Sequence, residues 1–103
     1  MKLIQIIGLI SMAMIVSSTA WAAGDAAKGK QVFMANCIAC HNPDPGKDGA
    51  VGPAVKGSSA ELVKVRVLQA KYPAGYKPKR DTNLMPPLPH LAGSIDDLAA
   101  FLK

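Results

Sequence analysis

Both cysteines of the chain lie in one short motif, Cys37-Ile38-Ala39-Cys40-His41. Two thiols at this spacing can form a disulfide, act as a redox pair or supply half of a zinc site. The zinc interpretation lacks ligands, because a tetrahedral site needs four and His90 is the one histidine outside the motif. No pattern of alternating strands and helices, typical of thioredoxin-like redox pairs, surrounds the motif. A disulfide stays open as a staple for a small exported chain.

The histidine directly after the second cysteine favours another use of the two thiols. C-x-x-C-H is the sequence at which c-type haem is attached. On one helical turn, thiols three residues apart can each add to one vinyl group of the same haem, and the next residue then lies under the iron. We therefore predict one haem c, bound covalently through Cys37 and Cys40, with His41 as an axial ligand of the iron.

The first 22 residues have the order of a secretory signal peptide. Lys2 supplies the positive end, residues 3–16 form an apolar stretch of 14 positions, and Ala20-Trp21-Ala22 fits an A-x-A cleavage site. The apolar stretch is short for a bilayer span of roughly 20 residues, so an uncleaved anchor is the weaker alternative. We predict cleavage after Ala22 and export to the periplasm. The remaining domain, residues 23–103, would have no stable membrane span.

The predicted domain has 81 residues, and its eleven Lys and Arg against seven Asp and Glu leave a net charge of +4. This charge is diffuse and is not interleaved with aromatic residues, so no nucleic-acid partner is predicted. A chain of this size buries only a modest core. Eight prolines and eight glycines after the leader indicate much loop. A large apolar cofactor would supply the missing core, and the haem-free chain should be largely unfolded.

Three segments have helical signals, and the fold class is predicted to be all-α. The first runs from about Asp25, a plausible N-cap, to Cys37. The second starts near Ser58 or Ser59 and ends before Pro73, although its three valines leave a strand as the alternative. The third opens at Ser94, where Asp97 would complete a capping box. The apolar positions at helical spacing are Ala26, Gly29, Val32 and Phe33, then Leu62, Val65 and Leu68, then Ile95, Leu98, Ala99 and Leu102, with Phe101 beside the third set.

Two long irregular stretches, residues 42–57 and 72–93, separate these helices. Both are rich in Gly and Pro. Structureless loops of this length are uncommon in a small domain unless they are functional or enclose a ligand. We therefore expect three main helices with long loops wrapped around one haem.

Residues 24–103 resemble class I c-type cytochromes. The resemblance rests on Gly29 and Phe33 before the C-x-x-C-H motif, on Gly52-Pro53 after it, on Met85-Pro86, and on Phe101 in the last helix. It implies a small cytochrome c fold, with Met85 as the sixth iron ligand opposite His41. It also implies that the backbone carbonyl of Pro53 accepts a hydrogen bond from His41. The first of these roles has separate support, because the other methionine outside the leader, Met34, lies just before the motif. His90 is the runner-up ligand.

The stretch from Lys71 to Arg80 is basic and contains two tyrosines. Charged stretches are often only solvated surface, and that interpretation stays open. Alternatively, a tyrosine or Arg80 binds a haem propionate, and the lysines form a docking surface for an acidic redox partner.

The predicted function is one-electron transport between redox proteins in the periplasm. The partners would be a donor dehydrogenase and an acceptor oxidase or reductase. With both axial positions filled, no coordination site is left for a substrate, so an enzyme is not predicted. The alternatives are a haem-c subunit of a larger periplasmic oxidoreductase, and a gas sensor or haem-based catalyst with a labile sixth ligand.

Overall fold

The computed structural model describes residues 24–103. The predicted signal peptide, residues 1–22, lies outside the described residues. Three α-helices and one 3₁₀ helix follow one another along the chain: α1 (Ala26–Asn36), α2 (Ala60–Gln69), η1 (Pro89–Ser94) and α3 (Ile95–Leu102). Residues 24–103 contain no β-strand. The all-α prediction is therefore confirmed, and the strand alternative for the second segment is wrong.

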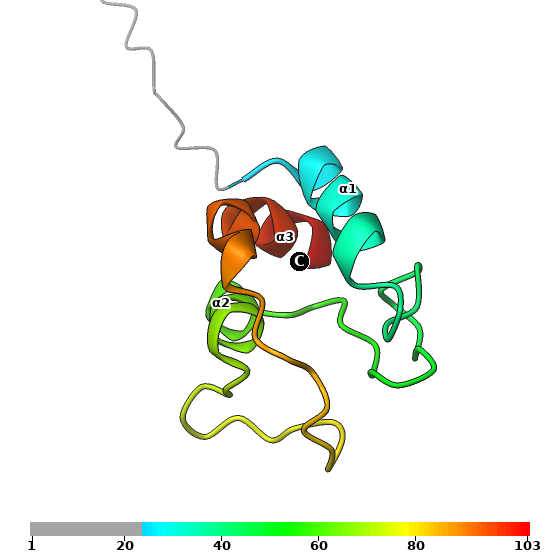
Figure 1. Ribbon diagram of the computed structural model, residues 1–103, viewed down its shortest axis with the longest axis vertical. Helices are drawn as coiled ribbons and strands as arrows, with labels where there is room; N and C mark the ends of the chain where they lie inside the picture. Colours follow the sequence, from blue (N-terminus) through cyan, green and yellow to red (C-terminus); the bar gives the residue numbers. More distant parts are fainter. Residues whose placement is uncertain (1–23) are drawn as a thin grey trace, which may run out of the picture.

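Helices α1 and α3 pack across each other, and α2 lies beside α3 and η1, as Figure 1 shows. The close approach of α1 and α3 depends on Gly29, because a Cβ atom at this position would overlap the backbone carbonyl of Asp97. A buried core joins all four elements. Its members are Phe33, Val63, Val67, Leu91, Ile95, Leu98 and Leu102.

The start of each of the first two helices is capped as the sequence predicts. The Asp25 side chain accepts hydrogen bonds from the amides of Ala27 and Lys28 at 2.9 and 3.2 Å. The Ser59 hydroxyl accepts one from the amide of Leu62 at 3.1 Å. Such caps satisfy amides that have no partner inside the helix. They fix the first residues of α1 and α2, and α1 then ends at Asn36, immediately before Cys37.

The predicted capping box at the third helix is wrong. Ser94 makes no side-chain cap, because it ends the 3₁₀ helix η1 and lacks the extended backbone of an N-cap. Asp97 has a different partner: its Oδ1 atom accepts the amide of Asp25 at 2.8 Å. This bond ties the start of α1 to α3.

The fully buried residues of the second helix are not the apolar set at helical spacing. Its buried residues are Val63 and Val67, one turn apart, whereas Leu62, Val65 and Leu68 are half-buried. The buried pair belongs to the core that α2 shares with η1 and α3, while Leu62 lines the cavity described below. The third helix does bury Ile95, Leu98 and Leu102.

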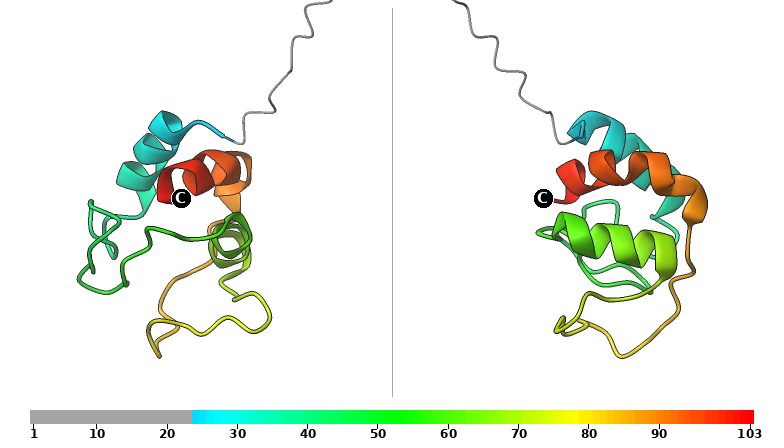
Figure 2. Two further views of the ribbon diagram at one scale, coloured as in Figure 1. Left: turned by 180° about the vertical axis from the view of Figure 1, so that it is seen from behind. Right: turned by 90° about the vertical axis from the view of Figure 1, so that its left-hand side faces the viewer.

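Two long loops, residues 37–59 and 70–88, connect the helices. Figure 2 shows them extending from the same side of the helices, away from the α1–α3 pair. Their inner surfaces, with those of α1, α2 and α3, enclose the candidate site.

Candidate functional site

The candidate site is a cavity of about 350 Å³ between the helices and the two loops. Much of its lining is apolar and comes from Phe33, Val51, Leu62, Val63, Val67, Leu84, Leu88, Leu98 and Leu102. Its cationic and phenolic residues are Arg66, Tyr72, Tyr76, Lys79 and Arg80. No carboxylate from residues 24–103 lines the cavity. The cavity therefore suits a large apolar group that also carries negative charge.

The C-x-x-C-H motif continues the chain from the end of α1 as a tight turn. The amides of Cys40 and His41 donate to the carbonyl of Cys37 at 3.3 and 2.9 Å. This turn brings Cys37, Cys40 and His41 into the cavity lining. The two thiols are not joined to each other. Burial raises the pKa of the Cys37 thiol to about 11, so the unattached side chain is neutral at physiological pH.

His41 is held by the segment that contains Gly52 and Pro53. Its Nδ1 atom lies 3.0 Å from the carbonyl oxygen of Pro53. Because a carbonyl only accepts, Nδ1 carries the proton and Nε2 is the nitrogen that can bind a metal. A Cβ atom at residue 52 would overlap the imidazole ring, so glycine allows this close approach. The amide of Gly52 in turn donates to the carbonyl of Cys40 at 2.9 Å.

Met85 lies in the second loop and reaches the same cavity. It is half-buried, packs against the hydrophobic core and lines the cavity with His41. His90, the runner-up ligand, is exposed in η1 and is outside the lining, as is Met34. The structure thus brings Met85, rather than His90, together with the motif.

Sequence reasoning missed Arg66 and Asp48. The Arg66 guanidinium lies 4.1 Å from the centre of the Tyr72 ring, and Tyr72 stacks on Tyr76 with ring centres 5.4 Å apart. Helical spacing offers a signal for Arg66, since it follows Leu62 by one turn. Asp48 pairs with a side chain from the other loop, and no local pattern indicates such a contact.

The family model for cytochrome c matches residues 26–103. The chain belongs to the cytochrome c family. Among curated proteins, the cytochrome c2 of Rhodomicrobium vannielii is 43% identical over 63 residues. The alignment covers 58% of this chain, and the chain spans about half the length of that relative, 49%. No solved structure matches the chain.

Membership of the cytochrome c family, together with the cysteine pair Cys37 and Cys40, implies a covalently bound haem c. The residues present fit this cofactor. The cavity lining contains the two thiols and the imidazole of one short motif, and much of the rest is apolar. Three cationic and two phenolic side chains of the lining suit the two carboxylates of haem. Among the helices of residues 24–103, none has both the length and the apolar character that a bilayer span requires.

Proposed function

We propose that the protein is a periplasmic one-electron carrier, with His41 and Met85 as the axial ligands of its haem iron. Bound haem supplies the redox chemistry by cycling its iron between ferric and ferrous. The observation that carries the proposal is one cavity whose lining contains both thiols, the Nδ1-bonded His41 and the thioether of Met85.

The hydrogen bond from His41 to Pro53 supports the proposed role of the imidazole. A ligating histidine usually donates its other ring N–H to a fixed acceptor, which sets the ring orientation and raises its basicity. Proline presents a rigid carbonyl, because its ring fixes φ. Pro53 is therefore the proposed positioning residue for His41.

The thioether of Met85 has two proposed effects. A soft sulfur ligand stabilises ferrous iron and raises the reduction potential. It would also occupy a ligand position on the iron that small molecules could otherwise take. Both effects suit an electron carrier rather than an enzyme.

The proposed partners are redox proteins, a donor dehydrogenase and an acceptor oxidase or reductase, that dock through acidic surfaces. The proposal rests on the basic loop, residues 71–80, and on the net charge of +4 for residues 23–103. The loop's charges are not equivalent, however. Lys79 and Arg80 donate to backbone carbonyls of the first loop, whereas Lys77 is exposed and makes no such bond within residues 24–103. Lys77 is thus the better candidate for docking.

Export is part of the proposal, and the signal peptide order of residues 1–22 supports it. Cleavage after Ala22 would leave residues 23–103 as a monohaem cytochrome c domain. A fixed haem-c subunit of a larger periplasmic oxidoreductase is the second candidate function. Its supporting observation is the exposure of Ile38, an apolar side chain outside the cavity lining that a permanent interface would cover.

Potentiometry and gel filtration of the exported holoprotein test this proposal. A free carrier gives a single reversible one-electron wave and elutes as a monomer from periplasmic extract. Elution of the haem protein in one large stable complex would favour the subunit. A high-spin ferric spectrum with an open sixth position would instead favour a sensor or catalyst.

A further inference from the structure

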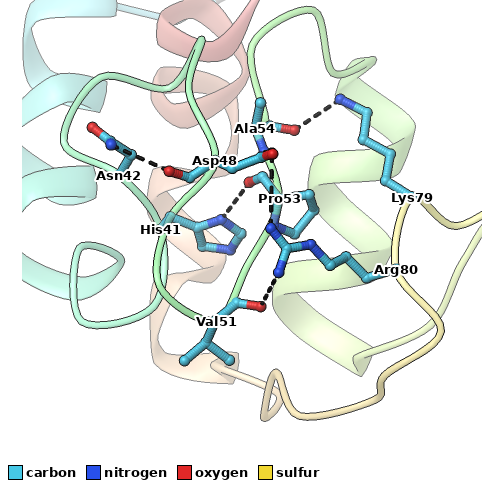
Figure 3. A network of polar contacts seen from close by, with 8 residues as sticks. All are labelled: His41, Asn42, Asp48, Val51, Pro53, Ala54, Lys79 and Arg80. Carbon is cyan, nitrogen blue, oxygen red and sulfur yellow. Dashed lines mark hydrogen bonds and ion pairs between the residues drawn. The ribbon is translucent and has the colours of Figure 1, made fainter.

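Two basic side chains of the second loop lie against the backbone of the segment that holds His41 (Figure 3). Lys79 Nζ donates to the carbonyl of Ala54 at 2.8 Å, and Arg80 Nη1 donates to the carbonyl of Val51 at 3.2 Å. Val51 and Ala54 flank Gly52-Pro53 on its two sides. The two cations therefore bind the two ends of segment 51–54, whose central residues face the imidazole.

Asp48 adds a third tie to this contact. Its Oδ1 atom accepts the amide of Ala54 at 2.8 Å and lies 3.9 Å from Arg80 Nη2. Its backbone carbonyl accepts the side-chain amide of Asn42 at 3.2 Å. The segment is thus fixed to its own loop through Asp48 and to the other loop through Arg80 and Lys79.

The same contact limits the loop that carries Met85. Arg80 anchors the loop before Met85, and the amide of Leu88 anchors it after, by donating to the carbonyl of Val67 in α2 at 2.6 Å. Between these anchors lie seven residues, 81–87. On the N-terminal side of Lys79 and Arg80, the next contact is the stack of Tyr76 on Tyr72.

We propose that Lys79 and Arg80 form a strap that holds the Pro53 acceptor of His41 and the Met85 loop in register with each other. The proposal rests on the proposed axial ligation by His41 and Met85. In it, Lys79 and Arg80 are positioning residues that act through the backbone of the 51–54 segment, not docking charges. Release of the strap weakens the hold on both axial positions together.

The expected effect follows from loop length and from the bonds lost. Without the strap, the unanchored loop grows from seven residues to the eleven of 77–87, which favours the open loop about twofold. Each lost hydrogen bond, from the exposed Lys79 or the half-buried Arg80, adds a factor of roughly three to ten. A ligand that competes with Met85 binds only the open loop, so its apparent affinity rises by the same factors.

The test uses ferric holoprotein and imidazole as the competing ligand. Lys79→Met and Arg80→Met should each raise the imidazole affinity roughly threefold to tenfold, and the double variant should raise it further. Lys77→Met is the matched control, because it removes the same charge from the same loop, and it should bind imidazole like the parent. Lys79→Arg keeps a donor and should restore the parental affinity.

A second measurement separates the strap from the ligation. The amide of Ala54 should exchange its hydrogen faster in Arg80→Met and in Asp48→Asn than in Lys77→Met, whatever occupies the sixth position. The parent protein could lack thioether ligation while the Ala54 amide still exchanges faster in these variants. In that case the proposed ligation is wrong and the strap contact is still supported. The strap would be overturned if Lys79→Met and Arg80→Met both match Lys77→Met in imidazole affinity and in the exchange rate of the Ala54 amide.

Discussion

Replacement of Gly52 by alanine tests how tightly the chain holds His41. A Cβ atom at this position would overlap three atoms of the imidazole ring, Cε1, Nδ1 and Nε2. The Phe33 ring lies on the same cavity lining, with its centre 6.4 Å from that of the imidazole. The added methyl must therefore displace the imidazole or the 51–54 segment. Either movement breaks the hydrogen bond from His41 to Pro53.

The cost can be worked out from these two effects. Forcing a methyl group into a packed site costs about 1–3 kcal/mol. Loss of the hydrogen bond adds about 1 kcal/mol. Gly52→Ala should therefore lower the free energy of unfolding of the holoprotein by about 2–4 kcal/mol, a large part of a typical total of about 5–15 kcal/mol. For a domain of this size, that is a fall of roughly 8–32 °C in Tm.

Denaturant and thermal unfolding of the holoprotein, followed by haem absorbance and by circular dichroism, measure this loss. Gly93→Ala is the matched control, because nothing lies within 4 Å of a Cβ atom at that position. The control should stay within about 0.5 kcal/mol of the parent. Equal stability of Gly52→Ala and Gly93→Ala would refute the argued contact between residue 52 and the imidazole.

Three further predictions concern the cofactor and the surface. Cys37→Ala and Cys40→Ala should each sharply lower the yield of stable holoprotein, and the double variant should lose its haem in denaturing electrophoresis; haem retained there would exclude thioether attachment. The haem-free chain without its leader should lack cooperative thermal unfolding by calorimetry, because the cofactor fills most of the core. If Lys77 docks the partner, Lys77→Glu should slow reduction by an acidic redox protein at low ionic strength but not at high salt. Lys64→Glu on α2 should leave the rate of reduction unchanged at both ionic strengths. Equal rates for both variants would leave Lys77 as solvated surface.

The helices were predictable because their signals are local. Asp25 and Ser59 cap α1 and α2 as their sequence positions indicate, and Pro73 follows the end of α2. The capping box at Ser94 failed because Ser94 ends η1 without the backbone of an N-cap. The Asp97 carboxylate instead accepts a hydrogen bond from the amide of Asp25, 72 residues earlier in the chain.

The buried face of α2 was not predictable from periodicity alone. Apolar residues occur on several sides of this helix, since it faces the core on one side and the cavity on another. Spacing cannot distinguish a leucine that lines a cofactor cavity from one that packs in a protein core. Only the positions of η1 and α3 decide that Val63 and Val67 are the buried pair.

The candidate site likewise has one part that the sequence predicts and another that depends on contacts between distant segments. The motif at residues 37–41 is contiguous, so its chemistry is readable from the sequence. The proposed roles of Pro53 and Met85 came from family resemblance, and the structure brings both residues to the cavity of the motif. The contacts of Lys79 and Arg80 with Val51, Ala54 and Asp48 join two irregular loops, for which no periodic pattern exists.

Substitution of Met85 tests the central claim, the axial pair of His41 and Met85, most directly. Met85→Ala removes the proposed thioether ligand, while Cys37, Cys40 and His41 keep the haem in place. Met34→Ala is the matched control, because Met34 is half-buried in α1 and outside the cavity lining.

The measurement is the near-infrared spectrum of the ferric protein, together with the reduction potential and carbon monoxide binding to the ferrous protein. We predict that Met85→Ala loses the weak sulfur-to-iron band, has a lower potential and binds carbon monoxide, whereas Met34→Ala keeps the properties of the parent. A Met85→Ala variant that keeps the parent's low-spin spectrum and potential would contradict the account.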